Sequence, residues 1–107
     1  MKFMIVTIAA ALTFPMCVCA ADAAASQAAY TKGCKACHGA QGEGNPAIAK
    51  MFSVTLPDLR SKEVQAKSDG DLKKAIVEGK GKMKPVKTLS ASEVDAAIAF
   101  VRSLGKT

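Results

Sequence analysis

The chain has 107 residues, half of them hydrophobic, with 15 basic against 9 acidic side chains and a formal net charge of +6. This length accommodates one domain and excludes a multidomain enzyme. It contains four cysteines, one histidine and no tryptophan, so few large side chains are available to fill a core. Domains this small usually depend on a metal, a cofactor or cross-links for their stability.

The first 20 residues have the pattern of a secretory signal peptide. Lys2 precedes an uncharged apolar run that ends in small residues at positions 18–20 (V-C-A). A cationic start, an apolar middle and a small-residue exit are typical of such a leader. An uncleaved membrane anchor is the alternative, because the run is about as long as a short spanning helix. We expect cleavage near Ala20/Ala21 and export of residues 21–107, as a single domain, to a bacterial periplasm.

Cleavage at this position changes the cysteine count. Cys17 and Cys19 would be removed with the leader, which leaves Cys34 and Cys37 as one closely spaced pair. Small secreted proteins held together by disulfides usually have several pairs spread along the chain. The single pair therefore argues against a disulfide-stabilised scaffold and points to another source of stability.

The exported part of the chain predicts helices joined by loops, with no convincing strand. From Ser26 onward, apolar and small residues recur at helical spacing, so a first helix is expected to run into the cysteine pair. Glycines between residues 39 and 44, followed by Pro46, predict a loop after it. A short helix is then expected over residues 58–66.

Two further helices complete the predicted set. Ser68 or Asp69 can cap a helix that ends at Gly79, and residues 80–87 are expected to form a loop. The last helix begins with a capping box, S-A-S-E, at residues 90–93. Its apolar residues share one face at helical spacing: Val94, Ala97, Ile98, Val101 and Leu104. These elements together predict a small all-α protein.

The segment C-K-A-C-H at residues 34–38 places the only histidine of the chain directly behind the cysteine pair. A structural zinc site needs four donors, and the exported part has no further cysteine or histidine. A thioredoxin-like pair would lie at a strand-to-helix junction of a βαβ unit, which is not expected here. A disulfide between Cys34 and Cys37 is possible, but it gives His38 no role.

Covalent haem gives all three residues a role. On a helix, Cys34 and Cys37 project to one side and can add across the two vinyl groups of a porphyrin as thioethers. His38, one turn after Cys34, then lies close to the ring, where its Nε2 can bind the iron. C-x-x-C-H is for this reason the pattern of c-type haem attachment. It predicts one covalently bound haem c, with its iron, as the cofactor.

Two methionines are available as the second axial ligand once the leader is removed. Met83 lies in a loop rich in glycine and lysine, and Pro85 restricts the backbone of the residue before it to extended geometry. Met51 lies in an apolar stretch, where filling a core is the default role of methionine. We therefore predict axial ligation by His38 and Met83, a pair that raises the reduction potential of the iron.

Residues from about Ser26 to Leu104 resemble the class I c-type cytochromes, in particular the small bacterial members with one haem. The resemblance rests on C-K-A-C-H, on G-K-M-K-P at residues 81–85, and on the terminal sequence T-L-S-A-S-E-V-D-A-A-I-A-F-V-R-S-L. It implies a small cytochrome c fold. In that fold the N- and C-terminal helices cross, and shorter helices and loops wrap around one haem.

The resemblance also implies roles for residues outside the haem motif. The aromatic residue four positions before the first haem cysteine packs against the last helix in this family, and Tyr30 and Phe100 match that pair. A proline carbonyl commonly accepts a hydrogen bond from the other nitrogen of the haem histidine, which makes Pro46 a cofactor-binding candidate. The family often places Met and Pro side by side, whereas Lys84 intervenes here.

These features predict a soluble, monomeric one-electron carrier that is not an enzyme. No acid–base or nucleophilic constellation accompanies the predicted haem. The alternative is a haem enzyme or ligand sensor in which Met83 can be displaced from the iron. The expected partners are redox proteins, with the membrane reached only transiently through them. Nucleic acid is excluded by export and by the lack of aromatic residues among the basic ones.

Lysines are concentrated late in the chain and bear on the choice of partner. One interpretation is that they only solvate a helix face and a loop. The other is that they surround the exposed haem edge and steer acidic docking surfaces towards it, an effect that salt would weaken. Only Glu78 opposes them in this segment, which contains Lys73, Lys74, Lys80, Lys82, Lys84 and Lys87.

Overall fold

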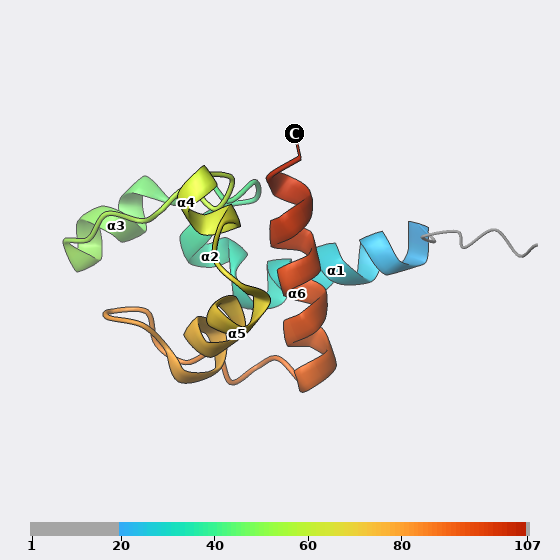
Figure 1. Cartoon of the computed structure of the whole chain (residues 1–107). Helices are drawn as coiled ribbons and strands as arrows, with labels where there is room; N and C mark the ends of the chain where they lie inside the picture. The colour runs from blue at the N-terminus through green and yellow to red at the C-terminus, as the bar shows by residue number, and fades with distance from the viewer. Residues whose placement is uncertain (1–19, 107) are drawn as a thin grey trace, which may run out of the picture.

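The computed structural model describes residues 20–106, which form six helices joined by loops (Figure 1). Over this range there is no strand, only an isolated bridge between Lys80 and Met83. The all-α fold is therefore confirmed. The helices are α1 (Ala20–Gly33), α2 (Lys35–His38), α3 (Pro46–Phe52), α4 (Lys62–Gln65), α5 (Asp69–Glu78) and α6 (Ala91–Leu104).

The expected signal peptide lies outside the described residues except for Ala20, and so do Cys17 and Cys19. Its cleavage, and the division of the chain that follows from it, therefore stay predictions. Within residues 20–106, none of the helices combines the length and the apolar composition that crossing a membrane requires.

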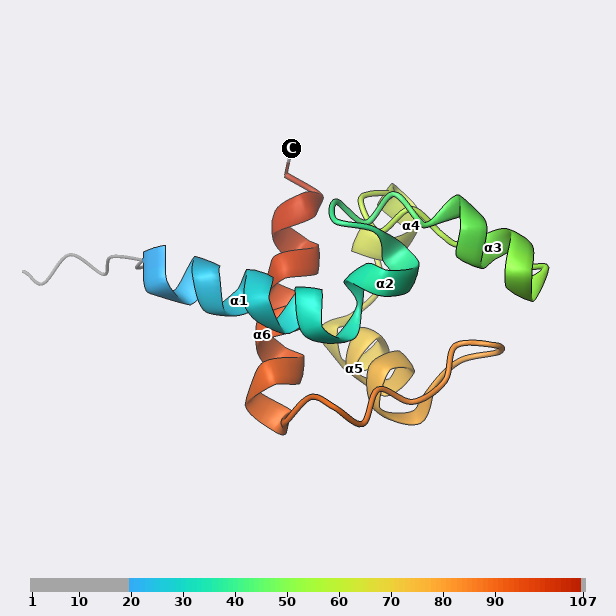
Figure 2. The same ribbon diagram turned by 180° about the vertical axis from the view of Figure 1, so that it is seen from behind.

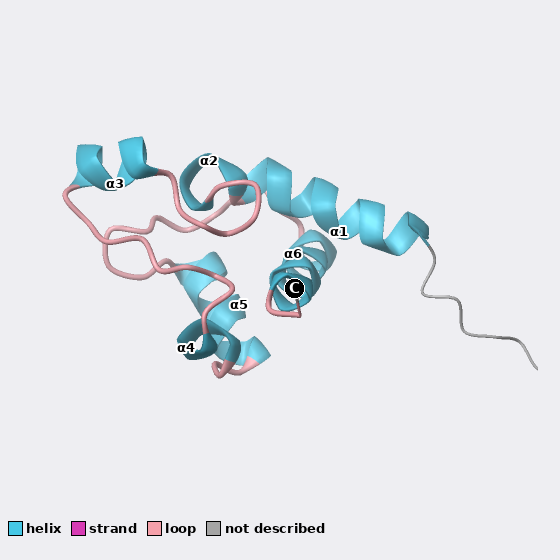
Figure 3. Ribbon diagram, turned by 90° about the horizontal axis from the view of Figure 1, so that it is seen from above, coloured by secondary structure: helices cyan, strands magenta, loops and turns pink. Residues whose placement is uncertain are grey.

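The crossing of α1 and α6 is the most extensive helix contact in the described chain, and Figure 3 shows α1 passing across α6. The predicted capping box starts α6. Ser90 Oγ accepts from the Glu93 N–H, and Glu93 Oε1 accepts from the Ser90 N–H at 3.1 Å. All five apolar residues predicted for its inner face are buried, so the register of this helix is confirmed: Val94, Ala97, Ile98, Val101 and Leu104.

An aromatic pair lies at this crossing. The rings of Tyr30 and Phe100 are 4.6 Å apart between centroids and tilted by 36°, which confirms the pairing that the family resemblance implied. Tyr30 is only 1% exposed, and its hydroxyl donates to the Gly39 carbonyl at 2.6 Å. The buried ring therefore joins α6 to the loop that follows the cysteine motif.

The first helix ends earlier than predicted. Cys34 has φ −126° and ψ −35°, so it separates α1 from the single turn of α2, and the cysteine motif is not one continuous helix. The Cys34 N–H still bonds to the Tyr30 carbonyl at 2.8 Å. The cysteine motif is thus attached directly to the helix that forms the crossing.

The middle of the chain departs most from the prediction. Helix α3 was not predicted, although Asn45 caps it by accepting from the Ala47 N–H at 3.0 Å and Pro46 occupies its first turn. Helix α4 is shorter than the expected span of 58–66. Its N-cap is Ser61, and the Asp58 side chain folds the preceding residues into a turn by accepting from the Arg60 N–H at 2.9 Å.

The fifth helix agrees with the prediction. Of the two candidate caps, Ser68 is the one used, because its Oγ accepts from the Asp71 N–H at 3.0 Å. Gly79 ends the helix with φ 82°, a conformation that favours glycine. Residues 80–87 form the predicted loop, called here the Met83 loop. Seen from behind, this loop and α3 extend to the same side of the helix crossing (Figure 2).

Candidate haem site

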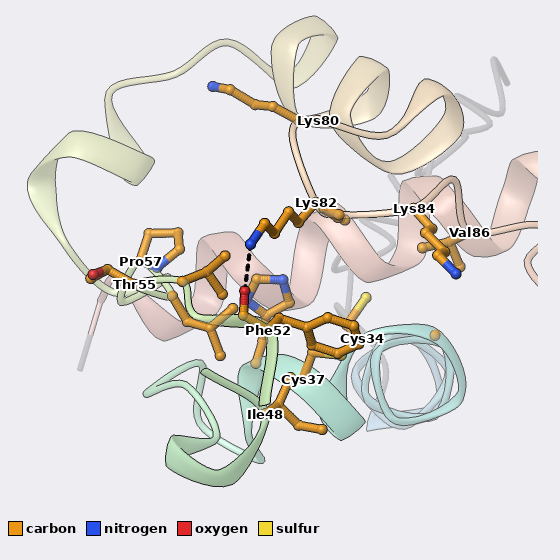
Figure 4. Close-up of a pocket in the computed structure, with 15 residues that line it drawn as sticks. Cys34, Cys37, Ile48, Phe52, Thr55, Pro57, Lys80, Lys82, Lys84 and Val86 are labelled. Atoms are coloured by element: carbon orange, nitrogen blue, oxygen red, sulfur yellow. Dashed lines mark hydrogen bonds between the residues drawn. The ribbon is translucent and has the colours of Figure 1, made fainter. Parts of the chain in front are cut away.

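A cavity of about 480 Å³ lies between three segments of the chain, namely the cysteine motif, residues 48–57 and the Met83 loop (Figure 4). It is called here the Cys37 cavity. Its volume is in the range of pockets that hold a cofactor or a drug-sized ligand. Its lining consists of Gly33, Cys34, Cys37, His38, Ile48, Phe52, Val54, Thr55, Leu56, Pro57, Lys80, Lys82, Met83, Lys84 and Val86.

A second cavity, of about 710 Å³, reaches the hydrophobic core and is called here the Ile98 cavity. Val64 and Ile76 contribute to its apolar wall together with Ile98 and Val101 of α6. The two cavities share several lining residues, so they are adjoining parts of one hollow: Cys34, His38, Thr55, Pro57, Lys80 and Met83.

The cysteine motif forms one turn against this hollow. The Cys34 carbonyl accepts from the N–H groups of Cys37, at 3.3 Å, and His38, at 3.0 Å. This turn brings both cysteines and His38 to the lining of the Cys37 cavity. The two thiols are free and not joined in a disulfide; Cys34 is buried and Cys37 is exposed.

The thiol of Cys34 does not have the properties of a redox-active cysteine. Burial, followed by the neighbouring Cys37 charge, raises its pKa to about 11. Reactive thiols of disulfide oxidoreductases instead have a lowered pKa, because the thiolate is the nucleophile. The pKa and the lack of any strand in residues 20–106 both argue against the thioredoxin-like alternative.

The imidazole of His38 is in the form that can bind a metal. Burial lowers its pKa, which favours the neutral ring at neutral pH. Its Nδ1 atom is buried and has no hydrogen-bond partner in this structure. A buried polar atom without a partner is costly, so this ring is incompletely satisfied by the polypeptide alone.

The structure does not form the hydrogen bond expected between Pro46 and His38. Pro46 is exposed, starts α3 and lines neither cavity. The two residues before Pro46 are hydrogen-bonded to the backbone of the cysteine motif instead. The Gly44 N–H donates to the His38 carbonyl at 2.7 Å and the Asn45 N–H to the Cys37 carbonyl at 2.9 Å. These bonds leave the imidazole Nδ1 unpaired, and the role of Pro46 stays a prediction.

The two methionines differ clearly in position. Met83 is half-buried and lines both cavities, opposite the cysteine motif. Met51 is 67% exposed and lines neither. The structure therefore brings Met83, and not Met51, to the same hollow as Cys34, Cys37 and His38.

The backbone around Met83 is held by short-range bonds. Lys80 and Met83 exchange two N–H to carbonyl bonds of 2.9 Å, and the Val86 N–H donates to the Ile76 carbonyl at 2.8 Å. At Gly79 a Cβ atom would approach the Met83 carbonyl oxygen to 2.6 Å, so only glycine lets the chain turn this closely. The Met83 loop therefore follows a backbone conformation at Gly79 that any other residue would disturb.

Lysines surround both openings of the hollow. Lys80, Lys82 and Lys84 line the Cys37 cavity, and Lys67 and Lys74 join Lys80 at the Ile98 cavity. Lys67 could not be identified from the lysine-rich segment of the sequence, because that segment begins at Lys73. Its proximity to Lys80 lowers the pKa of the Lys80 ammonium group.

Residues 48–57 were also missed as part of the site. Ile48 and Phe52 belong to α3, and Thr55 and Pro57 follow it. The signal for this helix was present in the pair Asn45-Pro46, a capping residue followed by a favoured first-turn residue. Nothing local in the sequence indicates that the helix lies across the hollow from the Met83 loop.

The residues of the hollow suit a haem c group. Two thiols can form its thioethers, and a neutral imidazole and a thioether sulfur are the pair that ligates iron in cytochromes c. The lining between these groups is largely apolar, as a porphyrin requires.

Comparison with known proteins agrees with this chemistry. The family model described as Cytochrome c matches residues 23–105, nearly all of the described chain. A comparison with curated proteins gave no significant match. Because the family match spans well over half of the chain and includes the C-x-x-C-H segment, this protein belongs to the cytochrome c family and has a covalently bound haem c with its iron as its cofactor.

Proposed function

We propose that this protein is a soluble one-electron carrier whose haem c is attached through Cys34 and Cys37 and ligated by His38 and Met83. One observation carries the proposal: these four side chains, which come from two distant segments, all line the Cys37 cavity. The family itself is associated with electron transfer. We further propose that residues 1–20 are removed during export to a periplasm, which mass spectrometry of the mature protein would test.

Each residue has a separate task in this proposal. The S–H groups of Cys34 and Cys37 would add across two vinyl double bonds of the haem, which would retain the cofactor in both oxidation states. His38 offers a nitrogen lone pair, because burial keeps its ring neutral. Met83 supplies a sulfur ligand, and the apolar walls limit the access of water. Haem iron, when bound, accepts and releases one electron between its ferric and ferrous states.

Ligation on both sides is what favours a carrier over an enzyme. A carrier needs no open coordination position, whereas oxygen activation or gas binding does. The second candidate is a haem enzyme or ligand sensor with a displaceable Met83. This alternative is favoured by one observation, that Met83 lies on a loop and not on a packed helix.

The partners of this carrier are redox proteins, and we propose that their docking surfaces are acidic. Lys80, Lys82 and Lys84 are exposed and line the Cys37 cavity, as does Cys37, which is itself exposed. Attraction between charged surfaces accelerates association at low salt and weakens as salt screens it. A rate of electron transfer that is independent of ionic strength would contradict acidic docking surfaces.

Absorption spectra of the holoprotein test the axial ligands. The protein is produced in a host that attaches haem c, and the ferric form is examined for the weak sulfur-to-iron charge-transfer band at long wavelength. Met83→Ala should abolish this band, whereas Met51→Ala should retain it. A band that survives Met83→Ala contradicts the ligand assignment. Rapid binding of carbon monoxide to the ferrous wild-type protein would favour the sensor or enzyme.

A further inference from the structure

A single side chain joins the two walls of the Cys37 cavity. The Lys82 ammonium group donates to the Phe52 carbonyl oxygen at 2.6 Å, between residues 30 positions apart in the chain. Figure 4 shows this bond reaching from the Met83 loop to the segment that carries Phe52. Both residues line the cavity, so the bond bridges two of the segments that enclose it.

The acceptor is well suited to a cationic donor. Phe52 is the last residue of α3, where backbone carbonyls lack a partner from the following turn. The next N–H groups bond further back: Ser53 to Ala49 and Lys50, and Val54 to Ala49. No backbone N–H of residues 20–106 donates to the Phe52 carbonyl. An ammonium group at this helix end is also favoured by the helix dipole.

The start of helix α3 is held by its N-cap, Asn45, which donates to the carbonyls of Ala36 and Cys37, but the rest of the helix has few contacts. It contributes no buried residue, and Met51 and Phe52 are 67% and 45% exposed. It makes no extensive contact with another helix of the described chain. Among the hydrogen bonds and ion pairs of residues 20–106, the Lys82 bond is the only one that links α3 to the Met83 loop.

We propose that Lys82 is a positioning residue, which ties the Met83 loop to the end of α3 and so keeps Met83 against the cavity. This inference rests on the proposed role of Met83 as an iron ligand. Lys82 immediately precedes Met83, so movement of its side chain is coupled directly to the methionine backbone. Without the tie, the loop and α3 separate, and small external ligands reach the iron more readily.

Lys84 provides a matched control within the same loop. It is exposed, carries the same charge and lines the same cavity. Its side chain makes no hydrogen bond or ion pair to any residue in the described part of the chain. Removing Lys84 therefore changes the local charge as removing Lys82 does, but breaks no bond between the walls.

Imidazole binding to the ferric holoprotein measures how readily the methionine leaves. We expect Lys82→Ala to raise the association constant of imidazole about tenfold, which corresponds to about 1.4 kcal/mol. Lys84→Ala should stay within about twofold of wild type. Lys82→Arg, which keeps a cationic donor, should restore most of the wild-type value. The titration is followed through the change in haem absorption when imidazole binds, which can also be read in a variant that lacks the sulfur band.

The outcomes separate this inference from the proposed function. Equal effects of Lys82→Ala and Lys84→Ala would show a general charge effect and overturn the tie. If imidazole binds more tightly to Met83→Ala but not to Lys82→Ala, the assignment of Met83 as the ligand stands and only the role of Lys82 is rejected. An unchanged affinity in Met83→Ala would reject the ligand assignment, and with it the inference.

Discussion

Two regions of the molecule are held in place by different means. One is the helix crossing, and the other is the side of the Cys37 cavity formed by α3 and the Met83 loop. At the crossing, α1 and α6 bury Tyr30 and a continuous apolar face of α6. On the other side, α3 contributes no buried residue, and within residues 20–106 one hydrogen bond links it to the Met83 loop. Close packing therefore defines one side of the domain, whereas the other side is arranged around a hollow.

This difference explains how so small a chain forms a domain. The buried cluster at the crossing has one large aromatic residue that is almost fully enclosed, and residues 20–106 bury no charged residue. Such a core is small, and a haem held in the hollow as proposed would add apolar volume on the opposite side. The family's cofactor is therefore part of the structure of this protein as well as its redox group.

The largest expected effect comes from removing the attachment of the cofactor. Cys34→Ala combined with Cys37→Ala should abolish covalent haem entirely, because no other cysteine lies in residues 20–106. The measurement is haem staining of the denatured protein, supported by its intact mass. Cys37→Ala alone is the control and should retain one thioether through Cys34. Covalent haem in the double variant would contradict the assigned attachment.

The next largest effect is expected from the crossing itself. Tyr30→Ala removes a ring that is 1% exposed and should lower the free energy of unfolding by about 3 to 5 kcal/mol. Met51 lies in α3, and its side chain is 67% exposed. Met51→Ala should therefore change the free energy of unfolding by less than about 0.5 kcal/mol. Denaturant titrations of both holoproteins provide the comparison. Similar losses of stability in the two variants would show that the helix crossing and α3 do not differ as described.

Alkaline pH should weaken the crossing through the same tyrosine. Burial raises the pKa of Tyr30 to about 12, from 10.0, and its hydroxyl donates to the Gly39 carbonyl. The contribution of this pKa difference to the free energy of unfolding is complete below pH 10. It is lost as the pH rises towards 12, because Tyr30 releases its proton at lower pH in the unfolded chain than in the folded one. The loss should approach roughly 2 to 3 kcal/mol.

Tyr30→Phe is the control for this pH dependence. It keeps the ring and every titrating lysine but has no phenolic proton. Its stability, followed by thermal unfolding between pH 9 and pH 12, should fall less steeply than that of wild type. Parallel curves for the two proteins would exclude Tyr30 as the source of the alkaline loss.

A smaller effect is expected where the Met83 loop begins. Gly79→Ala places a Cβ atom on a backbone with φ 82° and ψ 168° and 2.6 Å from the Met83 carbonyl oxygen. This substitution should lower the free energy of unfolding by about 1 to 3 kcal/mol and weaken the sulfur-to-iron band. Gly70→Ala in α5 is the control, because its Cβ would meet nothing closer than Ser68 Oγ at 3.8 Å. That change should stabilise the helix by up to about 1 kcal/mol.

The parts of the fold that were predictable are those with local signals. The capping box at Ser90 and the inner face of α6 follow from residues within one helix, and Gly79 marks a helix end by its own backbone preference. The pairing of Tyr30 with Phe100 came from family resemblance, since nothing local links residues so far apart. The break at Cys34 had no signal, because its neighbours continue the helical spacing.

The candidate site divides in the same way. C-x-x-C-H specifies the attachment chemistry by spacing alone, and the loop setting of Met83 distinguished it from Met51. The position of α3 could not be predicted, because the pair Asn45-Pro46 indicates where a helix starts but not where that helix lies in the fold. The bond from Lys82 to Phe52 depends on a backbone carbonyl, which is present at every residue and therefore carries no sequence signal.

The connection of Cys34 to Tyr30 and of Tyr30 to α6 bears on when the domain can form. Helices α1 and α6 are the first and last elements of the described chain, and their contact requires both to be present. Contacts between such distant segments form late, since a long loop must close first. Cys34, which is buried in the complete fold, therefore stays accessible for haem attachment until α6 is available to pack against α1.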